Sequence, residues 1–448
     1  MTLFARISAL RLACLPCLCC ALLSFATASA QVPIPETPAG KTLAFFFDAF
    51  NNADKAKLET YVKQYDSTNT AVNWLGFESQ TGGFTLLSIE SSAPDAITFR
   101  VKGRSDNITA FGSMKLSSID PPKVKSFSIR ALPPGVTVEN IAMDAALRDR
   151  TIEAISKRLT EYYVYPDVAT KMNEAIEQHA KHGNYNSMTD GNEFAEALSH
   201  DLREVSHDKH LFVGYNPFKS PPEKEDHGPR KPSPEELARW RSDLEHQNCS
   251  FSKVEILPRN IGYVKFGEFP SPEFCGATVA AAMGFVAHTD AVIFDMRENH
   301  GGDPSMVQLV VSYLFDEPTH INDLLNRHDN ETRQYWTLPY VQGPRLTGKP
   351  VFVLTSGETF SGAEEFTYDL QTQKRATIVG EVTGGGAHPM NGMSAGDHFM
   401  IGVPVGRPVN PITKTDWEGK GITPDLKVPA AEALEAAQKL AIEKLDKK

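Results

Sequence analysis

The chain contains a short, wholly apolar run that ends in a turn of small polar residues, and this feature limits the folds open to it. Val351 to Leu354 is apolar throughout, as in a buried strand, and Thr, Ser and Gly residues follow it. Helix-forming residues then run from Gly362 to about Lys374. A strand, a turn and a helix in immediate succession are typical of an α/β domain.

Ser361 lies where this predicted strand gives way to the predicted helix. The N–H groups of a helix's first turn are free and favour an anion, so Ser361 is placed as a nucleophile with the Gly362 N–H as an oxyanion donor. The alternative is that Ser361 is only the N-cap of the helix, with Glu364 completing a capping box. On this stretch alone, the N-cap is the commoner outcome.

The rest of the mature chain separates into segments of different pattern. Residues 31–135 show helical periodicity followed by alternating strands, which predicts a small α+β domain of unknown role. Residues 140–215 show helical periodicity three times over, which predicts a helical subdomain. Residues 216–260 read as an exposed loop and a helix, and residues 261–448 alternate strands and helices, which predicts an α/β domain.

Residues 1–30 have the pattern of a signal peptide. Arg6 and Arg11 lie in and at the end of a short basic region, Leu12 to Ala26 is an apolar run, and Ala28-Ser-Ala30 is a small-residue cleavage site before Gln31. This pattern predicts export to the periplasm or the medium, with no stable membrane anchor after cleavage. The competing interpretation is a lipoprotein attached through a cysteine of this stretch, but none of these cysteines has the expected preceding residues: Cys14, Cys17, Cys19 and Cys20.

Removal of residues 1–30 leaves Cys249 and Cys275 as the cysteines of the mature chain. Because an exported protein folds in an oxidising compartment, we expect these two residues to form a disulfide. Two free thiols are the alternative outcome.

The charge of the chain argues against one class of partner. The formal net charge is −11, and no basic stripe stands out in the mature sequence. Nucleic-acid binders need such a stripe to meet the phosphates, so we expect no nucleic-acid partner.

Further stretches carry residues that a serine nucleophile would need. The run VIFDMRENHGG begins as a buried strand and ends in a charged turn and the pair Gly301-Gly302, and glycines allow backbone N–H groups to approach an oxyanion closely. His210 begins an alternating strand and is a candidate general base. Glu418 lies between an aromatic residue and glycines, where a carboxylate can orient a histidine. Taken singly, these residues are more often a tight turn, an ordinary histidine and a solvated acid.

Metal chemistry has weaker support in the sequence. There is no H-E-x-x-H pattern and too few clustered ligands, so we expect neither a metal nor an organic cofactor.

Taken together, these stretches resemble the peptidase family that includes the tail-specific (C-terminal processing) peptidases, the tricorn core protease and the interphotoreceptor retinoid-binding protein modules. The resemblance is carried by VIFDMRENHGG, VLTSGETFSGAEEF and IVGEVTGGG. The stretches ending in DKHLFVGY and containing NPITKTDWEGKGITPD are most similar to the retinoid-binding protein branch. The resemblance extends over about residues 144–445.

The resemblance implies a crotonase-like core of repeated ββα units, preceded by a helical subdomain, and serine-type hydrolysis of peptide or protein substrates. Matched position by position, it makes Ser361 the nucleophile, His210 the histidine and Glu418 the acidic residue. The same match makes the oxyanion hole from the backbone of three glycines: Gly301, Gly302 and Gly362.

The sequence departs from the tail-specific peptidases in two places. Their lysine base lies in a glycine turn, and the corresponding turn here, residues 383–387, has no lysine. The segment from Tyr215 to Ile261 is also too short for the PDZ domain that those enzymes insert. Both departures favour a Ser/His/Glu site, with His207 and His388 as alternative bases.

Two other functions stay open on the sequence. The chain is alternatively a non-catalytic binder that keeps this fold and holds a hydrophobic ligand, as the retinoid-binding relatives do. A third possibility is an envelope interaction protein in which residues 41–132 carry the function.

Overall fold

The computed structural model describes residues 32–67, 69–132, 143–218, 232–396 and 398–447. The chain divides into two compact units, Met1–Val136 and Thr137–Lys448, and each is described by itself. The predicted signal peptide, with its cysteines and cleavage site, lies outside the described residues. Residues 219–231 of the predicted loop also lie outside them.

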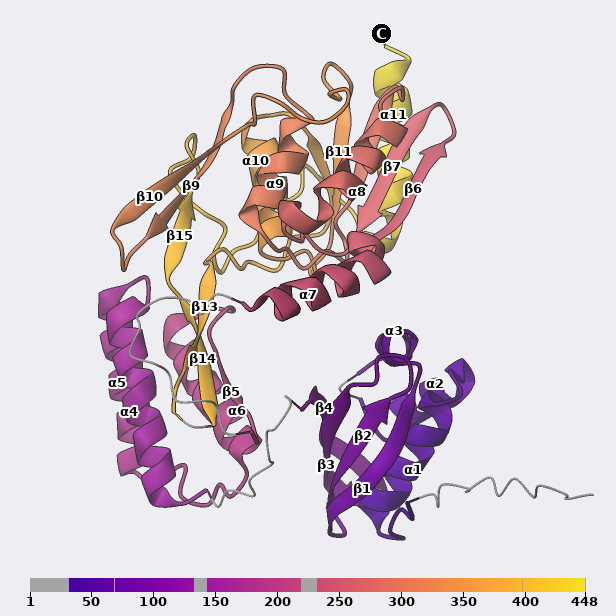
Figure 1. The fold of residues 1–448 in the computed structure, drawn as a ribbon. Coiled ribbons are helices and arrows are strands. Elements are labelled where there is room, and N and C mark those ends of the chain that lie inside the picture. Colours follow the sequence, from indigo (N-terminus) through magenta and orange to yellow (C-terminus); the bar gives the residue numbers. More distant parts are fainter. Residues whose placement is uncertain (1–31, 68, 133–142, 219–231, 397, 448) are drawn as a thin grey trace, which may run out of the picture. The chain divides into compact units, whose positions relative to one another are not determined.

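The first unit packs helices against one antiparallel sheet of strand order β1-β2-β3-β4 (Figure 1). Its helices begin at side chains that cap them, since Thr37, Asp54 and Thr70 each accept a backbone N–H of the first turn. A cluster of buried aromatic residues, including Phe46 and Trp74, fills the space between helices and sheet. The elements are α1 (Pro38–Phe50), α2 (Lys55–Gln64), α3 (Ala71–Thr81), β1 (Phe84–Ser92), β2 (Ala96–Gly103), β3 (Thr109–Ile119) and β4 (Pro122–Ala131).

The second unit begins with a helical layer that covers a small antiparallel sheet. The helices are α4 (Ala145–Tyr162), α5 (Pro166–Lys181) and α6 (Gly191–Ser206). The sheet has the order β13-β14-β5 and joins distant parts of the chain: β5 (Phe212–Tyr215), β13 (Met390–Ser394) and β14 (Phe399–Pro404). Phe194 and Leu198 of α6 lie in one buried cluster with Val213 and Ile401 of the sheet. The carboxyl end of α6 is thereby fixed beside the segment that leads into β13.

The larger sheet of this unit has six strands in the order β16-β12-β11-β8-β7-β6. All neighbouring pairs are parallel except β6 and β7, which are antiparallel. Every residue of β8 and β11 is buried, as the apolar runs in their sequences predict. The strands are β6 (Phe251–Leu257), β7 (Ile261–Phe266), β8 (Ala291–Asp295), β11 (Val351–Thr355), β12 (Thr377–Gly380) and β16 (Leu426–Lys427).

Helices cover both faces of the larger sheet (Figure 1). One buried cluster joins the sheet to α8 (Pro272–Phe285), α9 (Pro304–Ser312) and α10 (Gly362–Thr372), and another joins it to α11 (Ala433–Leu445). The protein is therefore a mixed α/β protein, as the sequence predicts. Because parallel strands end at one edge of their sheet, the segments that follow β8, β11 and β12 meet there.

The remaining elements are a hairpin, an outlying helix and short helical turns. Strands β9 (His320–Asn326) and β10 (Glu331–Trp336) pair with each other, and β15 (Gly406–Val409) pairs with β9. Helix α7 (Pro234–His246) starts at a capping box formed by Ser233 and Glu236. The short helices are η1 (Asn248–Ser250) and η2 (Ala430–Glu432).

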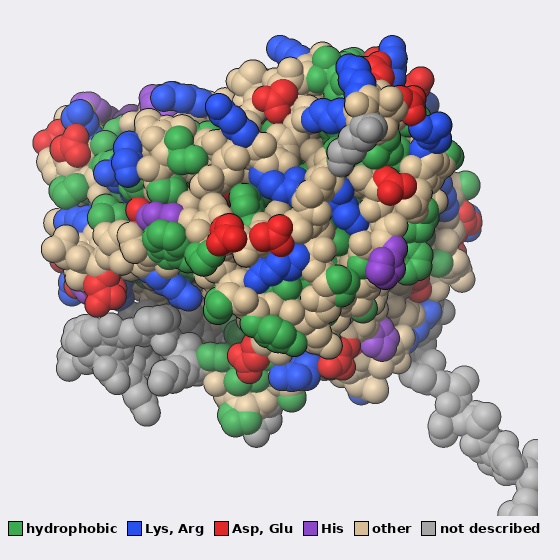
Figure 2. Space-filling model, turned by 90° about the horizontal axis from the view of Figure 1, so that it is seen from above, with side chains coloured by type: hydrophobic (Ala, Val, Ile, Leu, Met, Phe, Trp, Pro, Cys, Tyr) green, Lys and Arg blue, Asp and Glu red, His purple; other side chains and the backbone are tan. Residues whose placement is uncertain are grey.

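Cys249 and Cys275 are joined by a disulfide. Both residues are buried, and the bond ties η1 to α8. Within the described residues, every helix is too short or too polar to cross a bilayer. The face in Figure 2 shows acidic and basic side chains interspersed.

Candidate active site

Ser361 occupies the residue before α10 in a backbone conformation that few residues other than glycine adopt. Its φ is 53° and its ψ is −120°. Such a conformation costs about 1–3 kcal/mol and persists only where its surroundings enforce it, as at functional sites. Glu364 forms a capping box with Ser361, as the N-cap alternative expects, and its carboxylate accepts the Ser361 N–H at 3.0 Å. The N-cap interpretation accounts for this contact but not for the unusual backbone conformation of the serine.

The Gly301-Gly302 turn lies directly against Ser361. A Cβ placed on Gly301 would fall 2.8 Å from the Ser361 Cβ and 2.5 Å from the Gly362 backbone nitrogen. A Cβ on Gly362 would fall 3.0 Å from the Gly302 nitrogen. A side chain at Gly301 would collide with the opposite segment, and one at Gly362 would require that segment to shift by a few tenths of an ångström. The structure thus brings together three of the sequence-predicted glycines and the predicted nucleophile.

Two N–H groups of this cluster have no backbone or side-chain acceptor among the described residues: those of Gly302 and Gly362. The Gly301 N–H is different, because it donates to Asn299 Oδ1 at 2.9 Å. Gly301 therefore contributes its conformation, with a φ of 94°, whereas Gly302 and Gly362 present the free donors. Paired free amides beside a serine hydroxyl have the composition of an oxyanion hole.

Asn299 holds the two segments in register. This wholly buried side chain donates to the Phe266 carbonyl at 2.9 Å as well as accepting the Gly301 N–H. The backbone carbonyl of Asn299 accepts the N–H of Phe360 at 3.1 Å. One residue of the sequence motif therefore fixes both the glycine turn and the residue before the nucleophile.

His210 lies next to the residue that precedes Ser361. The centroids of the His210 and Phe360 rings are 4.8 Å apart. The backbone N–H of His210 donates to Asp208 Oδ1 at 3.0 Å. Its ring Nδ1 is buried and has no hydrogen-bond partner within the described structure.

The turn that follows β12 has no space for another basic side chain at this point. A Cβ on Gly386 would fall 2.1 Å from Phe360 Cζ and 2.8 Å from His210 Cε1. The imidazole of His210 therefore fills the space in front of this turn. This packing gives a physical reason for the absence of a lysine from residues 383–387.

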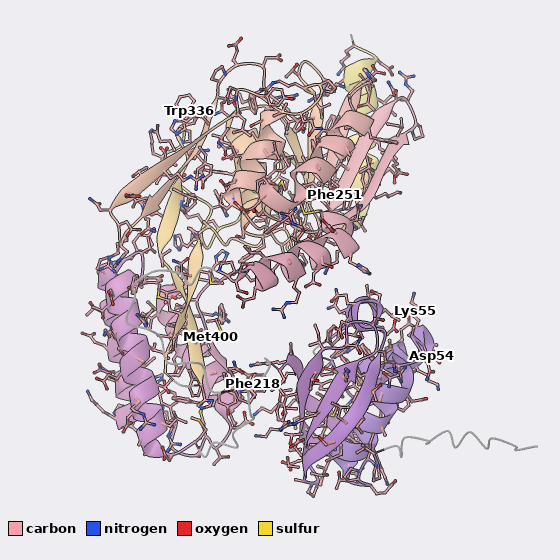
Figure 3. All side chains as sticks on the ribbon, in the orientation of Figure 1. Asp54, Lys55, Phe218, Phe251, Trp336 and Met400 are labelled. Carbon is pink, nitrogen blue, oxygen red and sulfur yellow. A yellow bond between two sulfur atoms is a disulfide. The ribbon has the colours of Figure 1, made fainter. Side chains whose placement is uncertain are left out.

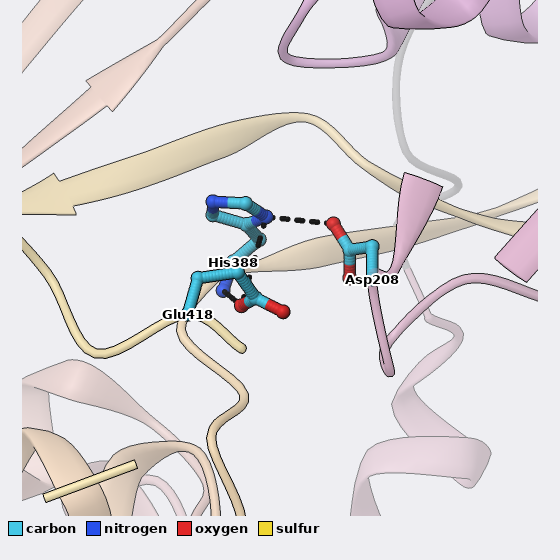
Figure 4. Close-up of side chains that lie close together, drawn as sticks. All are labelled: Asp208, His388 and Glu418. Carbon is cyan, nitrogen blue, oxygen red and sulfur yellow. Dashed lines mark hydrogen bonds and ion pairs between the residues drawn. The ribbon is translucent and has the colours of Figure 1, made fainter. Parts of the chain in front are cut away.

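A second histidine, His388, lies between two carboxylates (Figure 4). His388 Nδ1 is 2.6 Å from Asp208 Oδ2 and 3.7 Å from Glu418 Oε2. Glu418 Oε2 also accepts the backbone N–H groups of Ala387, at 2.5 Å, and His388, at 3.3 Å. The sequence interpretation paired Glu418 with His210, but the contacts in the structure join Glu418 to His388. Asp208 is the residue that contacts both histidine segments.

The electrostatics of this cluster distinguish the two histidines. Burial lowers the pKa of His210, although the charge of Asp208 opposes the effect. Burial also disfavours the charged form of His388, but the hydrogen bond and charge of Asp208, with the charge of Glu418, outweigh it and raise its pKa. The pKa of Glu418 rises to about 7 because of burial and the nearby charge of Asp208. These shifts favour the charged form of His388 and the neutral form of His210, the form that is able to accept a proton.

Glu364 connects the nucleophile to the turn after β12. Its buried carboxylate accepts the Ser361 N–H at 3.0 Å, the Gly385 N–H at 2.7 Å and the Gly386 N–H at 2.8 Å. The Thr383 hydroxyl adds a fourth hydrogen bond, at 2.5 Å. Burial raises the pKa of Glu364 despite these donors.

His388 and the two carboxylates beside it also have the composition of a metal site. Asp208, His388 and Glu418 each offer one ligand atom, and these atoms lie within 4.8 Å of one another. His388 Nδ1 bonds to Asp208, and Glu418 Oε2 accepts two backbone amides. Glu418 Oε1 and His388 Nε2 are buried and have no hydrogen-bond partner among the described residues.

His207, the other alternative base, is not part of this cluster. It ends α6 in the left-handed conformation, with a φ of 56°, and its side chain is exposed. Sequence reasoning did not single out Asp208 or Asn299, although both lie within the stretches that carried the resemblance. The signal available for Asp208 was its position two residues before a candidate base.

Two family models match consecutive parts of the chain. Residues 260–428 match peptidase family S41, and residues 141–258 match the N-terminal domain of peptidase S41 in eukaryotic IRBP. Together these matches span more than half of the sequence, including every residue of the candidate site.

Solved structures of low sequence identity also match. A putative peptidase from Parabacteroides merdae is 18% identical, with a TM-score of 0.47 over 67% of this chain and 98% of its own. A lipoprotein from Streptococcus agalactiae is 13% identical, with a TM-score of 0.45 over 68% of this chain and 100% of its own. The photosystem II D1 C-terminal processing protease is 14% identical, with a TM-score of 0.40 over 66% of this chain and 98% of its own. The assignment rests on the family models, and by them the chain belongs to peptidase family S41, with the N-terminal domain known from the retinoid-binding protein branch.

Proposed function

We propose that this protein is an exported serine peptidase that cleaves peptide or protein substrates through an acyl-enzyme, on a crotonase-like core. In this proposal Ser361 is the nucleophile, His210 the general base, and the N–H groups of Gly302 and Gly362 the oxyanion hole. Glu418 and Asp208 supply the negative charge that supports the histidines. No step of this mechanism needs a metal or an organic cofactor.

The observation that carries the proposal is the pair of free amides beside the strained serine. Gly302 and Gly362 come from different segments, after β8 and at the start of α10, and both N–H groups lack an acceptor among the described residues. Two such amides beside a serine can stabilise the negative oxygen of a tetrahedral intermediate, and removing one such donor typically lowers kcat by 10²–10³-fold.

The chemistry proceeds in two balanced steps. The Ser361 oxygen attacks the peptide carbonyl carbon while His210 takes the hydroxyl proton, and the tetrahedral oxyanion forms against the two amides. The carbon–nitrogen bond then breaks, and the leaving amine takes the proton from His210. In the second step a water molecule attacks the ester, gives its proton to His210, and releases the carboxylic acid as Ser361 recovers its proton.

The two carboxylates act on this sequence from behind the histidines. Asp208 fixes the backbone of His210 through one oxygen and the ring of His388 through the other. Glu418 has one oxygen, Oε1, that is buried and unpartnered within the described structure, as is His210 Nδ1. We propose that these two atoms interact, directly or through a water molecule, when the imidazolium forms.

A fluorophosphonate probe tests the nucleophile directly. The wild-type protein should react at one residue, and digestion and mass spectrometry should place the adduct on Ser361. Ser361→Ala should lose both the labelling and peptide hydrolysis, with little change in melting temperature, whereas Ser252→Ala, a change of an exposed serine on β6, should keep both. Hydrolysis that survives in Ser361→Ala would refute the assignment, and a protein that neither labels nor hydrolyses would favour the carrier of a hydrophobic ligand.

Single Ala substitutions at His210, His388 and His207 rank the bases. We expect His210→Ala to lose activity by about 10²-fold or more, in keeping with the loss of a general base. His207→Ala should be near wild type, because its side chain is exposed. Export is tested separately: N-terminal sequencing of the mature protein should begin at Gln31.

A further inference from the structure

One face of the small β13-β14-β5 sheet carries apolar side chains that the helices do not cover. Side chains alternate along a strand, so Val213 and Ile401 point into the core beneath α4, α5 and α6. Their neighbours Phe212 and Met400 point to the opposite face. The register places Met390 on that face too, because Met390 pairs with Pro404 and its neighbour Asn391 pairs with the buried Val403.

Three glycines form the floor under these side chains. A Cβ on Gly402 would fall 2.4 Å from the Phe212 ring and 3.0 Å from Met390 Sδ. Met400 lies over the other two, with its Cε 3.2 Å from a Cβ on Gly392 and its Cγ 3.2 Å from one on Gly214. The three apolar side chains therefore lie flat across backbone, which leaves their outer sides available for contact.

The two methionines of this face are unusually exposed for their type, and Phe212 is half-buried. Met390 and Met400 each have 40% of their surface accessible, and Figure 3 shows Met400 on β14. Methionine is flexible and polarisable, and it is favoured at surfaces that accept varied apolar groups. Exposed methionines beside a phenylalanine thus have the composition of an apolar binding surface.

The strands that carry this face follow the candidate active-site histidines directly along the chain. Strand β5 begins two residues after His210, and β13 begins two residues after His388. Two residues of chain span at most about 7 Å, which is also the length of about two residues of an extended peptide. Met400 pairs with Gly214 and lies over Gly392, about two residues farther along the sheet than Phe212 and Met390. A substrate held at Ser361 in extended form would therefore place a side chain on this face about two to four residues from the bond that is cut.

We propose that Phe212, Met390 and Met400 form a specificity subsite that binds one apolar side chain of the peptide substrate. This inference rests on the proposed peptidase function and adds a substrate class to it: peptides with a large aliphatic or aromatic residue near the cleaved bond. The patch consists of three side chains, which suits one substrate side chain and falls far short of the roughly 800 Å² per partner in a stable protein–protein interface.

Cleavage of a proteome-derived peptide library measures this preference. Mass spectrometry of the products should show aliphatic or aromatic residues enriched at one position near the cleavage site. In Met400→Glu the enrichment should vanish, and kcat/KM for the best peptide should fall by at least about tenfold, since burying such a side chain is worth that much. Phe285→Glu is the matched control, because it places the same charge at an apolar side chain that is 58% exposed on α8. Identical cleavage sites and rates in Met400→Glu and wild type would overturn the proposal.

Binding measured without cleavage separates the two proposals. Ser361→Ala is titrated against fluorescein-labelled hexapeptides that differ at one position in carrying Phe, Leu, Ala or Asp, and fluorescence polarisation gives Kd. Peptides with Phe or Leu should bind at least about tenfold more tightly than those with Ala or Asp, and adding Met400→Glu should abolish the difference. Equal Kd values across the series would refute the subsite even in an active peptidase. A clear preference in a protein whose wild type cuts no peptide would refute only the peptidase.

Discussion

Two buried acids on α10, Glu365 and Asp369, should make this protein less stable as the pH rises through neutrality. They lie one helical turn apart and are 5% and 1% exposed. Glu365 accepts one hydrogen bond, from Asn322 Nδ2 at 2.9 Å, whereas neither oxygen of Asp369 has a partner among the described residues. Burial raises the pKa of Glu365 from 4.5 to about 7, and burial with the charge of Glu365 raises that of Asp369.

The sign follows from which state binds more protons. Below the unfolded pKa both states hold the proton, so the stability is fully present. Between pH 4.5 and about 7 the folded protein keeps the proton of Glu365 while the unfolded chain releases it, and stability falls. A difference of this size corresponds to about 3 kcal/mol at 25 °C for Glu365 alone. The raised pKa of Asp369 acts in the same direction.

Glu365→Gln tests this magnitude, because the amide keeps an oxygen for Asn322 but carries no charge. Urea unfolding at pH 5 and at pH 8 gives the free energy of unfolding of variant and wild type. The free energy of unfolding of the variant, relative to that of the wild type, should rise by more than about 2 kcal/mol from pH 5 to pH 8. These two pH values cover most of the range over which Glu365 is expected to titrate. Comparing the difference between variant and wild type at each pH cancels the contribution of the other titrating groups. Glu174→Gln, at an exposed acid of α5, is the control and should show no such change. A difference between Glu365→Gln and wild type that is the same at both pH values would refute the reasoning.

Three further outcomes follow from the contacts around the site. Gly386→Ala should lower kcat/KM by about 100-fold, because its Cβ would displace the His210 ring, whereas Gly284→Ala, in open space on α8, should leave kcat/KM unchanged. The pH profile of kcat/KM should rise through an inflection near pH 7, where Glu418 ionises, and the inflection should be missing in Glu418→Gln; its persistence in that variant would exclude Glu418 as its source. Reduction of the disulfide at Cys249, which closes a separation of 26 residues, should cost about 3 kcal/mol in urea unfolding, and an unchanged midpoint would count against this estimate.

The parts of the site that are contiguous in sequence could be predicted from it. The run from Val351 to Gly362 shows its strand, turn and helix by local pattern alone, and the structure has β11 and α10 at those positions. The pattern of residues 31–135 does not distinguish α3 as a separate helix, since only a few of its residues are buried and its apolar pattern is weak. Its existence depends on packing against the rest of the first unit.

The pairing of carboxylates with histidines could not be predicted, because it depends on contacts between distant residues. Asp208 and His388 are 180 residues apart and meet because β5 and β13 both pair with β14. Strand β13 consists of MNGMS, which has no clear apolar alternation, so neither its pairing nor its register was visible in the sequence. Glu418 was therefore assigned to His210, and the structure joins it to His388.

The four hydrogen bonds of Glu364 have a consequence for genetic screens of this protein. The residue performs no chemistry in the proposed reaction, yet it sets the distance between the serine and the turn that borders His210. A screen that reads only growth or turnover would score Glu364→Ala as a null allele indistinguishable from loss of Ser361 or His210. Null alleles at this codon therefore report on the architecture of the catalytic segments. Counting all null alleles would overstate how many side chains take part in bond cleavage.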